Sequence, residues 1–141
     1  MANPANSTAY RLSDGRLAVN VTEAKTLAAQ DSGYVQNITA ESVTVTLPAV
    51  ATQGIWTVRN GGVADTGAPA GSGDDGTAIV VDCQAADTMA GLDVEGTEKD
   101  GKTLTNTAAT ARIGDEITLI NTGATNGGIV HAVKGIWARQ A

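Results

Sequence analysis

Apolar side chains alternate with polar ones along several short stretches of the chain. In residues 42–47, Val43, Val45 and Leu47 would point to one face, and the threonines between them to the other. Pro48 then ends the stretch, because proline cannot donate a hydrogen bond to a neighbouring strand. This spacing of two residues predicts a β-strand with one buried face.

Similar stretches recur along the chain, separated by turn dipeptides such as Asp14-Gly15 and Ser32-Gly33. Further strands are predicted at residues 17–22, 34–38, 55–58, 78–81, 116–120 and 129–133, with a short one at 136–138. Two Ala-rich stretches, 23–29 and 83–90, are too short for independent helices, and we expect the first to be strand-like and the second irregular. The pattern predicts an all-β fold, either a small antiparallel β-barrel or a β-sandwich.

Two segments lack this alternation of apolar and polar residues. Residues 1–11 begin with small and polar residues and include Pro4, which is typical of an N-terminal arm that orders against a partner. Residues 12–141 then form a single β domain. Within it, residues 61–76 are rich in Gly and Asp, so we expect a long loop that projects from one edge of the domain.

The composition predicts a thin hydrophobic core. The chain has two Trp, two Tyr and no Phe, so little apolar area is buried for each residue that is ordered. Association with further copies or with a partner would add the missing burial, and we therefore expect an oligomer. The candidate interface residues come from the arm and the last strands; they are Tyr10, Arg11, Val130, Val133, Ile136 and Trp137.

The charge and the single cysteine narrow the choice of function. With a net charge of −6 and only nine Lys and Arg, the chain lacks the basic face that nucleic acid requires. Cys83 has no second cysteine to pair with and is expected to be a small buried residue. No signal peptide and no membrane-spanning stretch are recognised, so we expect a protein that folds in the cytosol and contacts no membrane.

The residue types needed for catalysis are sparse. His131 is the only histidine, and the alternation places it on the same strand face as Ile129 and Val133, which favours a packed or interface histidine over a catalytic one. Asp74-Asp75-Gly76 lacks the spacing of a calcium-binding loop. We therefore expect no enzyme activity, no cofactor and no metal site.

Other motifs have structural interpretations. Three triplets match the glycosylation pattern, which without a secretory signal indicates only richness in Asn and Thr; they are Asn6-Ser7-Thr8, Asn20-Val21-Thr22 and Asn37-Ile38-Thr39. Trp56 and Trp137 each follow Gly-Ile. Core packing is the simplest role for both, and an interface position is the alternative for Trp137.

Short motifs along residues 26–138 resemble bacteriophage virion proteins. The first is Thr26-Leu27, followed by Asp31-Ser32-Gly33. The others are the stretch 43–49 (VTVTLPA) and Thr57-Val58-Arg59-Asn60-Gly61. The second half continues the likeness with residues 103–107 (TLTNT), 112–115 (RIGD), 117–120 (ITLI) and 135–138 (GIWA). Together they resemble the small decoration, or cement, proteins of phage heads.

This resemblance implies a small β-rich protein that binds the outside of a finished capsid and stabilises it. It would be made in the host cytoplasm and located on the virion surface. Its partners would be the major capsid protein and copies of itself, because such proteins often form homotrimers. The long loop at 61–76 leaves one alternative, a receptor- or carbohydrate-binding module on a head fibre or tail.

Overall fold

The computed structural model describes residues 9–62, 79–84, 89–90, 103–107, 110–121, 123 and 128–139. In these ranges the regular elements are strands and one 3-10 turn, which confirms the all-β prediction. In chain order they are β1 (Tyr10–Arg11), β2 (Leu17–Val21), β3 (Lys25–Thr26), η1 (Ala29–Asp31), β4 (Val35–Ile38), β5 (Thr44–Thr46), β6 (Gly54–Asn60), β7 (Ile79–Asp82), β8 (Met89–Ala90), β9 (Thr103–Asn106), β10 (Glu116–Asn121), β11 (Gly128–Lys134) and β12 (Ala138–Arg139).

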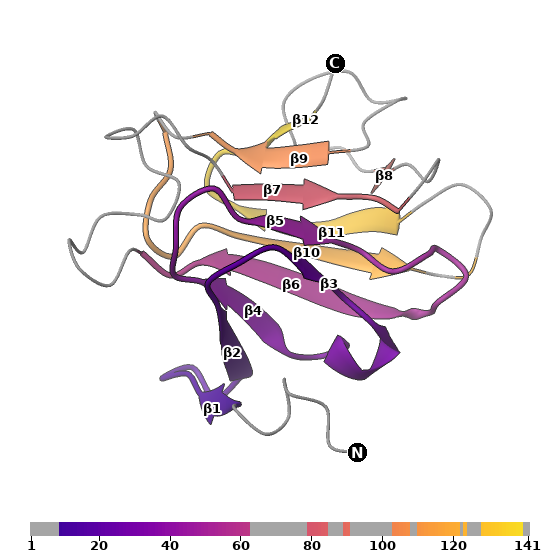
Figure 1. Ribbon diagram of the computed structural model, residues 1–141, viewed down its shortest axis with the longest axis horizontal. Coiled ribbons are helices and arrows are strands. Elements are labelled where there is room, and N and C mark those ends of the chain that lie inside the picture. Colours follow the sequence, from indigo (N-terminus) through magenta and orange to yellow (C-terminus); the bar gives the residue numbers. More distant parts are fainter. Residues whose placement is uncertain are drawn as a thin grey trace.

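The strands form two sheets that lie one over the other (Figure 1). The seven-stranded sheet has the order β1-β2-β4-β6-β10-β11-β8, and the five-stranded sheet the order β12-β9-β7-β5-β3. Each sheet keeps two open ends in the part of the chain that the structure describes, so the barrel alternative is not realised. The prediction of purely antiparallel pairing is also wrong, because both sheets are mixed.

The first half of the domain winds as a parallel coil. The chain passes alternately through the two sheets, with β2, β4 and β6 in one and β3, β5 and β7 in the other. A chain that crosses to the second sheet before each return comes back in the same direction, and consecutive turns of the coil therefore pair in parallel. We refer to β2–β7 as the coil.

The second half closes the domain with antiparallel strands. β10 pairs with β6 and β11, while β9 pairs with β7 and β12. A bulge interrupts the β10–β11 ladder: Thr118 lies opposite Ala132 and Leu119 opposite Val130, so His131 has no partner residue on β10. The extra residue shifts the alternation, and Val130 faces the core while Ile129 and His131 are exposed. The predicted common face of Ile129, His131 and Val133 is therefore wrong.

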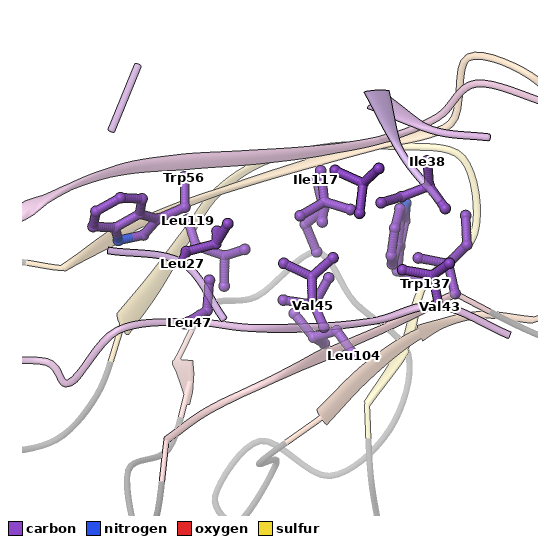
Figure 2. Packing of buried hydrophobic residues seen from close by; sticks show 14 of the residues in the cluster. Leu27, Ile38, Val43, Val45, Leu47, Trp56, Leu104, Ile117, Leu119 and Trp137 are labelled. Atoms are coloured by element: carbon purple, nitrogen blue, oxygen red, sulfur yellow. The ribbon is translucent and has the colours of Figure 1, made fainter. Parts of the chain in front are cut away.

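Side chains from both sheets meet in one core (Figure 2). Val43, Val45 and Leu47 are buried, as their alternation predicts, and Cys83 is also buried. Figure 2 shows Trp56 and Trp137 towards opposite ends of this core, each packed among aliphatic side chains. Both indoles therefore have the core-packing role.

A buried polar network ties the coil to the closing strands. Asn60 at the end of β6 donates from Nδ2 to Oδ1 of Asn106 at 2.7 Å, and Asn106 donates from its own Nδ2 to Oδ2 of Asp115 at 2.9 Å. Asp115 Oδ2 also accepts from the backbone N–H of Arg112, and Asn106 Nδ2 also donates to the carbonyl of Ile136. These bonds satisfy polar groups that would otherwise be costly to bury.

Glycine at position 135 is required beside this network. Its φ of +87° lies in the left-handed region, and a Cβ there would collide with the carboxylate of Asp115. The turn from β11 to β12 is further held by Trp137, which donates from Nε1 to the carbonyl of Lys134 at 3.1 Å.

Several predicted boundaries shift. Tyr10 and Arg11, assigned to the arm, form β1 and pair with β2. The last strand begins at Ala138, so Ile136 and Trp137 precede it. Leu17, the first residue of β2, is exposed, and the β1–β2 hairpin lies at one end of the molecule (Figure 1). Residues 1–8 of the arm, residues 63–76 of the Gly/Asp-rich loop, and the Asp74-Asp75-Gly76 and Asn6-Ser7-Thr8 motifs lie outside the described residues.

Candidate interaction surface

The face of the seven-stranded sheet that points away from the core is the candidate functional surface, and we call it the outer face. Strand pairing places residues of neighbouring strands in columns across it. One column, the polar column, comprises Asn20, Asn37, Arg59, Glu116 and Lys134. A parallel column, the isoleucine column, comprises Ile55, Ile120 and Ile129.

Asparagine amides connect the strands at one end of the polar column. Asn37 donates from Nδ2 to Oδ1 of Asn20 at 3.2 Å and to Oη of Tyr10 at 3.1 Å. Its own Oδ1 accepts a bond from Nη1 of Arg59 at 3.3 Å. Tyr10 Oη in turn donates to Oδ1 of Asn20. The amide of Asn37 is thus held between β1, β2 and β6.

An ion pair attaches the loop of the β1–β2 hairpin to Glu116 of the polar column. Arg16 donates from Nη1 and Nη2 to the two carboxylate oxygens of Glu116, both at 2.8 Å, and also binds Asp14. Glu116 and Asp14 together raise the pKa of the Arg16 guanidinium. The hydrogen bonds from Arg16 lower the pKa of the Asp14 carboxyl. This bidentate ion pair fixes the hairpin on the outer face.

The isoleucine column makes a second part of the outer face apolar. Ile55 is 39% exposed and Ile129 46% exposed, although each sits in a regular strand. Between them and the polar column, the hydroxyl groups of Thr57 and Thr118 share a hydrogen bond of 3.1 Å. A strip of exposed aliphatic side chains beside a charged and amide-rich rim is typical of protein–protein contact surfaces.

The structure distributes the predicted interface residues over three environments. Tyr10, Arg11 and Ile136 are exposed, Val130 and Val133 are partly buried against the core, and Trp137 is 1% exposed. Of these six residues, only Tyr10, on β1, bonds to the polar column. Trp137 packs inside the domain and offers no surface to a partner.

Sequence reasoning missed both columns. The repeated Asn-x-Thr triplets at 20–22 and 37–39 were the available signal, since parallel pairing places Asn20 beside Asn37 and Val21 beside Ile38. The isoleucines come from distant positions and become neighbours only through strand pairing.

The remaining candidate features of the described residues are a metal site, a membrane-spanning helix and a surface depression. Among these residues, no group of three or more His, Cys, Asp and Glu side chains could hold a metal ion, and no helix could span a membrane. An open depression of about 170 Å³ lies in the turn from β2 to β3 and is lined by residues 20–25, which places Asn20 of the polar column at its edge.

Neither a family model nor a curated protein sequence matches the chain.

Proposed function

We propose that this protein is a structural component of a bacteriophage virion that binds the outside of the capsid and stabilises it, without catalysis. Its partners would be the major capsid protein and further copies of itself. The proposal is supported by the motifs that resemble phage cement proteins and by a fold that offers an extended sheet face rather than an enclosed site.

The observation that carries the proposal is the isoleucine column. Ile55 and Ile129 expose apolar surface on a strand face where alternation allows polar residues at no structural cost. Burying such a strip against a partner contributes roughly 25 cal/mol for each Å² removed from water. Arg59, Glu116 and Lys134 beside it would orient the contact, because charges at the rim of an interface mainly determine specificity.

The alternative of a carbohydrate-binding module has less support. Such a site needs an aromatic platform, and both tryptophans are buried in the core. Tyr10 is exposed, but its hydroxyl group is engaged by Asn20 and Asn37. We therefore favour a protein surface as the partner of the outer face.

Binding to phage heads tests the proposal. Purified protein is added to heads from the encoding phage with this gene deleted, and bound protein is quantified after sedimentation. We expect saturable binding that Ile129→Asp weakens at least about tenfold, since a charge in a buried contact costs more than 1.4 kcal/mol. Ile113→Asp is the matched control, because Ile113 is 50% exposed in a turn outside the column.

The outcomes separate the function from the surface. Absence of wild-type binding to the heads contradicts the capsid proposal itself. Wild-type binding that Ile129→Asp and Ile113→Asp leave equally strong would place the contact elsewhere on the molecule. Circular dichroism of each variant verifies that it is folded.

The arm and the symmetry are tested with the same material. Deletion of residues 2–8 leaves β1 intact and should weaken head binding if the arm orders on the capsid. Light scattering of the purified protein and the stoichiometry on heads test the homotrimer; a monomer in both settings would contradict it.

A further inference from the structure

β3 is the first strand that the coil contributes to the five-stranded sheet. It forms one edge of that sheet in the part of the chain that the structure describes. Strand pairing aligns Lys25 of β3 with Val45 of β5, Val81 of β7 and Leu104 of β9. The last three side chains are fully buried and face the core. The terminal position of this apolar column is therefore occupied by a lysine.

The Lys25 side chain is 28% exposed, and its ammonium group bonds to buried polar groups rather than only to solvent. Its Nζ donates to Oε1 of Gln36 at 2.8 Å and lies 3.5 Å from Oδ1 of Asp31. Gln36 is fully buried and Asp31 is 3% exposed. The neighbouring Leu27 is buried in the same core, while Thr26 between them is exposed on the opposite side.

Gln36 is likewise a polar residue in an apolar column, on the facing sheet. It is aligned with Val19 of β2 and Val58 of β6, both of which are buried. Each sheet thus has one polar residue in a column of aliphatic ones, and the two polar residues bond to each other. This pair of polar residues lies at the edge of the hydrophobic core, beside β3.

We propose that Lys25 prevents the β3 edge of one copy from pairing with the β3 edge of another. An open edge strand offers unpaired backbone groups to any further strand, and an inward-pointing charge is one way to make that addition unfavourable. A second copy on this edge would bring two ammonium groups together and remove both from water. The parallel coil needs this protection because each of its turns is a template for the next.

Replacement of Lys25 by the residue of its column tests the proposal. Lys25→Val should form species larger than those of the wild-type protein, increasing with concentration, in light scattering at tens of micromolar. Thr26→Val is the matched control: it adds the same side chain to the same strand but on the side away from the core, and it should keep the wild-type mass. Equal masses for Lys25→Val and wild type over the concentration series would overturn the proposal.

Two more variants guard against a change of fold. Lys25→Val alone removes the bond to Oε1 of the buried Gln36 amide, so Lys25→Val/Gln36→Val restores apolar columns in both sheets and should associate at least as strongly. Lys25→Arg keeps a charge at the edge and should retain the wild-type mass. If the folded double variant also keeps that mass, Lys25 has no such role. All readouts use purified protein without heads, so they are independent of the proposed capsid binding.

Discussion

Asn37 donates a hydrogen bond to Asn20 across two parallel strands, and the two residues belong to Asn-x-Thr triplets 17 positions apart. The bond joins consecutive turns of the coil on the outer face. Amide side chains stacked in register in this way stabilise parallel strands. The same triplets that match a glycosylation pattern therefore have a structural role in this fold.

Loss of the Asn37 amide should destabilise the protein more than loss of the Asn20 amide. Asn37 is buried and bonds to Asn20, Tyr10 and Arg59, whereas Asn20 is exposed and water can replace its partners. We expect Asn37→Ala to lower the free energy of unfolding by about 2 kcal/mol and Asn20→Ala by less than about 1 kcal/mol. Urea denaturation of both variants measures the difference; equal losses would contradict the ranking.

Local periodicity predicted most of the strands and most of their faces, but it missed β1, β8 and β9. Val43, Val45 and Leu47 are buried because a strand with one face on the core needs apolar side chains at every second position. Periodicity does not encode strand direction, and the parallel coil was therefore missed. The one sequence sign of it was the repeated triplet at Asn20 and Asn37.

The contacts that make the candidate surface depend on pairing between distant segments. Arg16 and Glu116 are 100 residues apart, and Ile55 meets Ile120 only because β6 and β10 pair. The bulge at His131 likewise reverses a face assignment that strict alternation predicts. A register shift of one residue exchanges the two faces, so such surfaces cannot be read from a single strand.

Asn106 should be one of the most sensitive polar positions. Asn106→Ala leaves Nδ2 of Asn60 and Oδ2 of Asp115 without one buried partner each. Because a lost buried hydrogen bond costs about 1 kcal/mol and one to a carboxylate about 1.5–3 kcal/mol, we expect a loss of about 3 kcal/mol in the free energy of unfolding. Thr107→Ala, at the adjacent exposed position, should change it by less than about 0.5 kcal/mol. A loss for Asn106→Ala no larger than that for Thr107→Ala would show that the network contributes little.

Lowering the pH should destabilise the β1–β2 hairpin because Asp14 becomes protonated. The bonds from Arg16 lower the Asp14 pKa below its ordinary value of 3.8 in the folded protein, so the carboxylate stabilises the fold above that value. This contribution is lost as the pH falls through the lowered folded-state pKa. Arg16, whose pKa is raised, stays protonated throughout and adds no pH dependence in this range.

The comparison of Asp14→Asn with wild type isolates this effect from other carboxylates. The variant should have the lower urea midpoint at neutral pH, and the gap should narrow as the pH falls below about 4 and the wild-type carboxylate becomes protonated. A gap that is constant over the whole range would mean that the Asp14 charge does not contribute.

The two tryptophans should differ when each is replaced by phenylalanine. Trp137 donates from Nε1 to the carbonyl of Lys134, whereas Nε1 of Trp56 is buried without a hydrogen-bond partner among the residues that the structure describes. Both substitutions remove similar volume from the core, but only Trp137→Phe also removes a bond, and Trp56→Phe removes an unsatisfied donor. We expect Trp137→Phe to cost about 2 kcal/mol more in the free energy of unfolding. Because Trp137 is buried within its own protomer, the folded variant should keep the wild-type mass in light scattering. A lower mass for folded Trp137→Phe would instead indicate that the indole supports a contact between copies.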